Sequence, residues 1–213
     1  MWPRVEIIYA PKRKGISFSD VEIKHLLISV LALILAFSMM LWSFGEGYRL
    51  EFAFAAAVIA VGTGFLLHEM AHKFVAQRFK CWAEYRYSPF GLLLTVVSAL
   101  AGFLIAAPGA VFISGNVTRR ENGLISIAGP GTNLAIGAMI LPIALFVIPE
   151  FGGLLLFVAY INLFLGIFNM LPVPPLDGSK IYPWNLLVYI ATFAALIALI
   201  IPVYLIMIGR LTF

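Results

Sequence analysis

Five long runs of apolar residues divide the chain. They cover residues 26–44, 52–76, 124–148, 153–171 and 184–208. Each run has about the 20 mostly apolar residues that a helix needs to cross the hydrocarbon core of a bilayer. The pattern predicts an all-α polytopic membrane protein. We expect a polar leader at 1–24, a single membrane-embedded domain at 25–208 and a short tail at 209–213.

A sixth apolar run, residues 89–108, fits two arrangements because Pro residues bracket it and Gly91 and Gly102 interrupt it. If it crosses and the N-terminus is inside, six helices leave ten Lys and Arg residues on the inner side and four on the outer side. If it enters and returns, five helices give a split of 12 to two. Basic residues gather on the cytoplasmic side of membranes. We therefore expect five transmembrane helices plus a re-entrant element, with six helices as the alternative and the N-terminus cytoplasmic.

Three short segments alternate weakly between apolar and polar residues, at 4–10, 15–19 and 82–87. Such alternation is typical of half-buried strands, and it predicts a small β-sheet at the inner membrane face. About two dozen mixed residues precede the first apolar run, which is unlike a cleavable signal peptide. We therefore expect the polar leader to remain attached.

Composition points to a chain that faces lipid. Hydrophobic residues make up 62% of the 213 residues and charged residues 11%, with a mean hydropathy of +1.03. A soluble domain normally has about 45–50% apolar and roughly 25% charged residues. The single cysteine, Cys81, excludes a disulfide within the chain. The net charge of +4 fits anchoring at a membrane surface, so we expect no nucleic-acid partner.

Two of the three histidines enclose a glutamate in the sequence HEMAH, residues 68–72. On a helix, His68 and His72 are neighbours on one face and can both bind one metal ion. Glu69 then lies to the side, where a carboxylate can take a proton from metal-bound water. The pattern indicates a hydrolytic zinc site, since three ionisable residues within an apolar run are costly without a bound cation.

A catalytic zinc site usually has three protein ligands, so a third ligand is needed. The chain has two aspartates, Asp20 in the polar leader and Asp177 in the Pro-rich sequence 169–178. Prolines there cannot continue the preceding helix, so the segment can unwind and direct a carboxylate back into the bundle. We therefore expect Asp177 to be the third ligand.

Two asparagines are further candidates. Asn133 follows Gly129 by four residues and precedes Gly137 by four, which gives a stripe of small residues where another helix can approach. Its amide is suited either to binding the oxyanion of a reaction intermediate or substrate backbone, or to hydrogen bonding between helices. Asn169 allows the same two interpretations.

Three motifs together resemble the site-2 protease family of intramembrane zinc metalloproteases. They are HEMAH at 68–72, AGPGTN at 128–133 and NMLPVPPLDG at 169–178. Their order and spacing are similar to the core of that family over about residues 52–178. Residues 108–113 are similar to the edge strand on which the family holds an extended substrate. The insert at 90–107 departs from the family, because it separates two strands that we expect to be nearly contiguous.

The resemblance implies one Zn²⁺ per chain, a general base and two residues near the substrate. The implied zinc ligands are His68, His72 and Asp177, the base is Glu69, and the residues near substrate are Asn133 and Asn169. The chain is thus expected to be an intramembrane metalloendopeptidase of the cell membrane, with its active site nearer the cytoplasmic face. It would hydrolyse transmembrane proteins or peptides with zinc-activated water.

A membrane metal-binding or metal-carrier protein without hydrolase activity is the alternative. Glu69 argues against it, because a site that only binds metal has no need for a carboxylate between the two histidines. A metalloprotease of another lineage, with a distant Glu as third ligand, is a second alternative. The sequence leaves open the natural substrate, its cleavage site, the regulation and the oligomeric state.

Overall fold

The computed structural model describes residues 16–44, 49–103, 105, 107–148 and 151–209. In this part of the chain, five helices are long and apolar enough to cross a membrane, as the five apolar runs predict. Two of them include a π-helical turn, η1 or η2. The five are α1 (Asp20–Phe44), α2 (Leu50–Val61) continued by η1 (Gly62–Leu66) and α3 (Leu67–Arg78), α5 (Arg119–Pro142) continued by η2 (Ile143–Val147), α6 (Gly152–Asn169) and α8 (Leu186–Met207).

Some helices begin well before their apolar runs, because polar side chains cap their first turns. Ser19 Oγ accepts a hydrogen bond from the Glu22 N–H, so α1 starts inside the predicted leader. At α5, Thr118 and Glu121 form a capping box, in which each side chain binds the other residue's backbone. The apolar runs therefore locate these helices correctly and miss their first turns.

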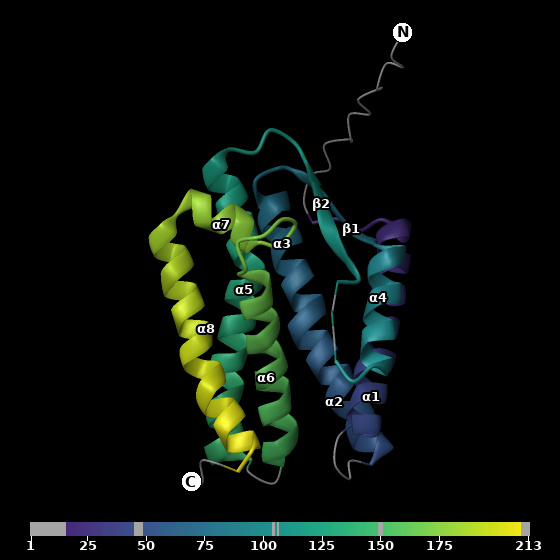
Figure 1. Ribbon diagram of the computed structural model, residues 1–213. Helices are drawn as coiled ribbons and strands as arrows, with labels where there is room; N and C mark the ends of the chain where they lie inside the picture. The colour runs from purple at the N-terminus through teal and green to yellow at the C-terminus, as the bar shows by residue number, and fades with distance from the viewer. Residues whose placement is uncertain (1–15, 45–48, 104, 106, 149–150, 210–213) are drawn as a thin grey trace.

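The helices alternate in direction, so that one end of the bundle gathers the functional segments. α1 and α5 begin there, α3 and α6 end there, and the two strands lie at the same end (Figure 1). The short helix α7 (Gly178–Trp184) lies at the same end. We call this end of the bundle the sheet end.

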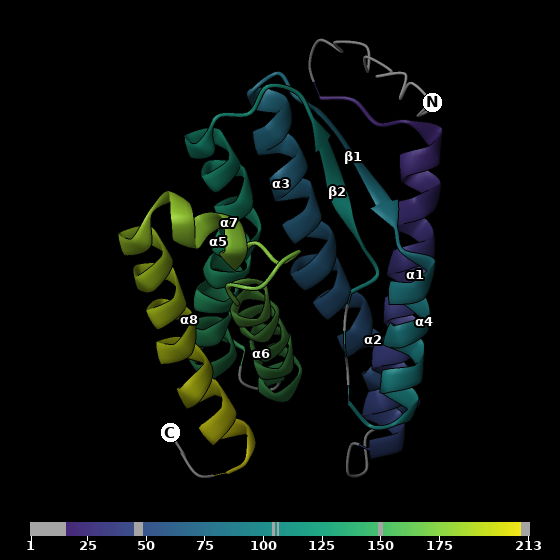
Figure 2. The ribbon, with the colours of Figure 1, turned by 45° about the horizontal axis from the view of Figure 1, so that its top comes forward.

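Residues 89–108 leave the sheet end and return to it. α4 (Pro89–Leu100) packs against α1 (Figure 2), and the chain then leads back to the second strand. Thr95 Oγ1 donates to the Ile105 carbonyl at 2.9 Å, and the Ile105 N–H donates to Ser98 Oγ at 3.0 Å. These bonds tie the return to α4. This path out and back is the one that the charge count favours, and α4, with 12 residues, is shorter than the five helices that are long enough to cross a membrane.

A two-stranded antiparallel sheet joins the ends of this element. β1 (Trp82–Tyr87) pairs with β2 (Gly109–Ser114), with Tyr87 opposite Gly109 and Trp82 opposite Ser114. The strands predicted at 82–87 and 108–113 are confirmed. Residues 16–19 form no strand, and the strand suggested at 4–10 lies outside the described residues.

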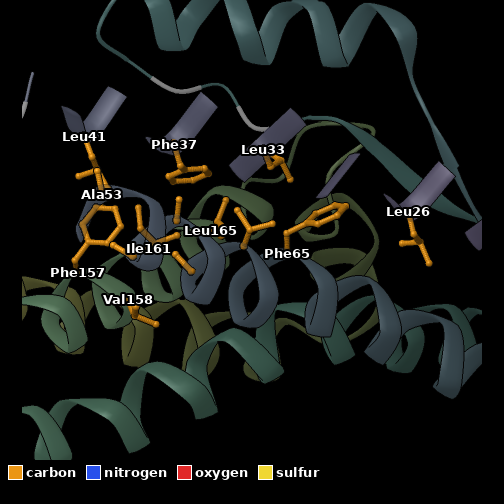
Figure 3. Close-up of a cluster of buried hydrophobic side chains, with 14 of the residues drawn as sticks. Leu26, Leu33, Phe37, Leu41, Ala53, Phe65, Phe157, Val158, Ile161 and Leu165 are labelled. Atoms are coloured by element: carbon orange, nitrogen blue, oxygen red, sulfur yellow. The ribbon is translucent and has the colours of Figure 1, made fainter. Parts of the chain in front are cut away.

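Buried apolar side chains fill the space between α1, α2, η1 and α6. Figure 3 shows Phe37 and Leu33 of α1 facing Phe65 of η1 and Leu165 of α6. A second apolar cluster joins α5, α6, α7 and α8. The long helix that ends in α3 therefore stands between packed neighbours, which fixes the direction of the side chains it presents.

Candidate metal centre and active site

His68 and His72 lie one turn apart on α3 and are both buried. The π-helical turn η1 immediately precedes α3 within the same continuous helix. The two Nε2 atoms are 3.0 Å apart, so both imidazoles are directed at one point. The spacing of four residues therefore places both rings on one helix face, as the sequence predicts.

Asp177 approaches the histidines from the segment that follows α6. The helix ends at Asn169, and the Pro-rich residues 172–175 project toward α3 (Figures 1 and 2). Proline cannot donate the backbone hydrogen bond that would continue the helix. Gly178 allows tight packing here, because a Cβ at this position would collide with the Met170 carbonyl. The segment is thereby held where its carboxylate meets α3.

The carboxylate of Asp177 completes a three-residue cluster. Its Oδ2 lies 3.1 Å from His72 Nε2 and 3.4 Å from His68 Nε2. A carboxylate is the form of aspartate that binds a metal ion, and its oxygen here faces both ring nitrogens.

Hydrogen bonds hold the Nδ1 atom of each ring, which points away from the cluster. The His72 Nδ1–H donates to the Ile125 carbonyl at 2.7 Å, and the His68 Nδ1–H donates to Asn133 Oδ1. In a neutral imidazole the other nitrogen, Nε2, then carries a lone pair. All three ligand atoms lie within 4.8 Å of one another. Two imidazole nitrogens and one carboxylate oxygen, each held by its surroundings, fit a catalytic Zn²⁺ site.

Asn133 is completely buried behind His68 and belongs to a chain of amides. Its Nδ2 donates to the Gly64 carbonyl at 2.9 Å and to Asn162 Oδ1 at 3.3 Å. Because the Gly64 carbonyl can only accept, Asn133 must present its oxygen to His68. Asn162 Nδ2 in turn donates to Thr63 Oγ1 at 2.9 Å. The amide chain thus sets which nitrogen of His68 carries the proton.

A cavity of about 160 Å³ lies beside the cluster. Glu69, whose exposed fraction is 8%, lines it together with the three ligand residues. Asn169 also lines it, whereas Asn133 does not. Apolar side chains from α1, α2, η1 and α6 form the side of the cavity that faces the bundle interior, namely Leu33, Phe37, Val61, Phe65, Leu165 and Phe168.

Strand β2 forms another wall of this cavity. Gly109, Val111 and Ile113 line it together with Glu69. Within the described residues, β2 pairs with β1 on one side and has no strand on the other. The open edge of β2 and the side chain of Glu69 therefore line the same cavity.

The residues proposed from sequence for metal binding and catalysis come together in space. His68, Glu69, His72 and Asp177 share one cavity, and Asn169 lies at its wall. Asn162, in the middle of an otherwise apolar helix, also belongs to the site and is absent from the candidates that the sequence suggests. A polar amide inside an apolar run was the available signal, because such residues are rare in membrane helices unless they bind something.

Comparison with known proteins agrees with this geometry. The profile of Peptidase family M50 matches residues 148–192, which include Asp177. The chain is 41% identical over 174 residues to "Putative zinc metalloprotease MJ0611" of Methanocaldococcus jannaschii, covering 79% of this chain and 86% of that protein.

Two bacterial relatives are also named as zinc metalloproteases. "Putative zinc metalloprotease YwhC" of Bacillus subtilis is 32% identical over 58% of this chain and 66% of its own length. "Putative zinc metalloprotease Rip2" of Mycobacterium tuberculosis is 31% identical over 64% of this chain and 61% of its own length. No solved structure gave a significant match.

Proposed function

Because the chain belongs to peptidase family M50, we propose that it is an intramembrane zinc metalloprotease that cuts transmembrane proteins or peptides. One observation carries the proposal. His68, His72 and Asp177 converge beside the carboxylate of Glu69 at a single cavity, and five helices are apolar enough to place that cavity within a membrane. The names of the relatives support zinc as the metal.

The three converging residues would hold one zinc ion through His68 Nε2, His72 Nε2 and a carboxylate oxygen of Asp177. Bound zinc supplies Lewis-acid chemistry, since it lowers the pKa of a bound water and polarises a carbonyl. Asn133 keeps His68 in the tautomer that presents Nε2. Glu69 takes a proton from the attacking water and passes it to the nitrogen of the departing peptide segment.

The open edge of β2 suits a substrate that is locally extended. In an α-helix the backbone groups are engaged with one another, so a helical substrate must unwind before its backbone can pair with a strand. Pairing with β2 would lay the peptide across the cavity next to Glu69. The side-chain amide of Asn169, at the cavity wall, can donate to a substrate carbonyl.

Charge supports an orientation with the sheet end in the cytoplasm. Among the Lys and Arg residues that the structure describes, only Arg49 lies at the opposite end. The positive-inside rule then puts the sheet, the start of α1 and the active site on the cytoplasmic side of the cell membrane. The site lies on the last turns of the second crossing helix, near that face.

The test is Glu69→Gln, which removes the base and preserves size. Wild-type chain reconstituted with zinc should cut a reporter that carries one transmembrane helix in lipid vesicles. The variant should lose that activity while still binding about one zinc per chain. Glu51→Gln makes the same chemical change at an exposed position of α2 and should retain full activity.

Two results would contradict the proposal. Cleavage by Glu69→Gln at the wild-type rate would exclude the base. Tight zinc binding by a wild-type chain that cuts no reporter would favour a metal-binding or metal-carrier protein. Glu69 itself argues against that alternative, because its carboxylate lies at the cavity without being needed as a ligand.

A further inference from the structure

The outer edge of β1 has no partner strand among the described residues, yet side chains occupy its backbone groups. Lys73 Nζ donates to the Ala83 carbonyl at 2.8 Å. The Tyr85 N–H donates to Glu22 Oε1 at 3.0 Å, and the Tyr87 N–H donates to His25 Nδ1 at 3.3 Å. Side chains of α1 and α3 therefore close the edge of β1 that faces away from β2.

Two of these side chains form a buried ion pair. Lys73 Nζ lies 2.8 and 2.7 Å from the two carboxylate oxygens of Glu22, and both residues are 0% exposed. Burying two charges is expensive, and a well-packed apolar pair often gives equal stability. Stability alone does not explain this ion pair. Each of its side chains also forms a hydrogen bond with one backbone group of β1, which points to a role in positioning the strand.

The pair connects α3 and α1 to the register of the sheet. In antiparallel strands, backbone groups of successive residues point alternately toward and away from the partner strand. Because Ala83 and Tyr85 point away from β2, their partners Ile113 and Val111 also point their backbone groups to the open side. Val111 and Glu69 line the same cavity.

A shift of one residue in the pairing of β1 with β2 would reverse which backbone groups point to the open side. It would turn every backbone group of the strand to the other side, leaving Glu22 and Lys73 without their bonds to β1. Lys73 follows the ligand His72 directly in α3, so the anchor of the sheet and the metal site belong to the same helical turn. The position of the sheet is thus fixed relative to the helix that carries the metal ligands.

We propose that Glu22 and Lys73 are positioning residues that set which backbone groups of β2 face Glu69, and thereby select the peptide bond that is cut. This inference rests on the proposed protease function. The same contacts close β1, so that an extended substrate pairs with β2 alone. Neither residue touches the substrate, because both lie on the far side of β1 and are completely buried.

The test is the double variant Glu22→Leu/Lys73→Met, which replaces the ion pair with apolar side chains of similar size. It avoids leaving one buried charge alone, which would unfold the protein. The exposed pair of Arg49 and Glu51, at 3.2 Å, gives the matched control Arg49→Met/Glu51→Leu. Zinc content, thermal stability, hydrogen exchange of β1 and the cut positions in the reporter are measured for each.

The double variant should keep its zinc and its melting temperature within a few degrees. Hydrogen exchange at the Tyr85 amide should be at least tenfold faster. Mass spectrometry of the products should show the wild-type bond cut at least tenfold more slowly, with cuts at neighbouring bonds added. The control should match wild type in all of these measurements.

A folded double variant that cuts only the wild-type bond at the wild-type rate would overturn the inference and leave the proposed function intact. A wild-type chain that cuts nothing would overturn the proposed function instead. If the double variant does not fold, His25→Phe removes one acceptor at the same edge without removing a buried charge. Added cuts by His25→Phe would then support the inference, and an unchanged cut would overturn it.

Discussion

A single methyl group at Gly129 should remove the metal site. Gly129 lies on α5 facing the two histidines of α3. A Cβ at this position would lie 2.5 Å from His68 Nε2 and closer still to His72 Nε2. The Gly129→Ala variant therefore directs its methyl group at the two nitrogen atoms that would bind zinc.

The size of the effect follows from these distances. Carbon and nitrogen atoms that do not bond stay about 3.5 Å apart, so each imidazole must retreat by roughly 1 Å. Zinc–ligand distances tolerate only about 0.2 Å. Losing ligands in this way should weaken zinc binding at least 100-fold, or by about 3 kcal/mol at 1.4 kcal/mol for each factor of ten.

Competition with a coloured chelator measures zinc affinity in detergent, and reporter cleavage is followed in parallel. Gly131→Ala is the matched control on the same helix, since no atom lies within 4 Å of the Cβ that it adds. The control should bind zinc normally and gain up to about 1 kcal/mol of stability from its better helix propensity. Gly129→Ala should instead lose zinc and activity together.

Wild-type zinc affinity in Gly129→Ala would contradict this prediction. It would mean that the histidines do not bind zinc through the Nε2 atoms that face α5. Unfolding is distinguished from a local effect by the thermal stability of the zinc-free protein. That stability should be similar in Gly129→Ala and in zinc-free wild type.

Three further predictions concern the ligands and the topology. Asp177→Ala should lower both zinc affinity and cleavage, and full zinc occupancy with unchanged affinity would require another third ligand. Asn133→Leu, which frees the Nδ1 nitrogen of the first histidine, should weaken zinc binding about 10- to 100-fold, whereas unchanged affinity would show that the amide chain is not needed. In a Cys81→Ser background, single cysteines replacing Arg78 and Asn116 should be labelled from the same side of sealed vesicles. Labelling from opposite sides would show that the intervening insert crosses the membrane.

Much of the fold could be read from the sequence because lipid imposes a simple requirement. A crossing helix must be apolar over about 20 residues, and each of the five runs meets that condition. The charge count favoured a path in which residues 89–108 leave and return to the same end of the bundle. The internal bonds of this segment could not be foreseen, since they depend on Thr95 and Ser98 meeting a returning chain. Helix α7 was also missed, because Pro183 within seven residues obscures a helical pattern.

The metal ligands were predictable for a different reason, which is that their chemistry restricts residue types and spacing. His68 and His72 needed only helical periodicity, whereas Asp177 needed the unwinding that the nearby prolines impose. Long-range partners could not be deduced in this way. Nothing in the local sequence links Asn162 to Asn133, or Glu22 to Lys73, although each pair meets in the folded chain.

Anomalous X-ray diffraction at the zinc absorption edge, from crystals of protein that cuts the reporter, can show whether His68, His72 and Asp177 hold one catalytic zinc ion. We expect one strong peak, at about 2.0–2.2 Å from both Nε2 atoms and an oxygen of Asp177. A peak elsewhere, or no peak in active protein, would contradict this expectation.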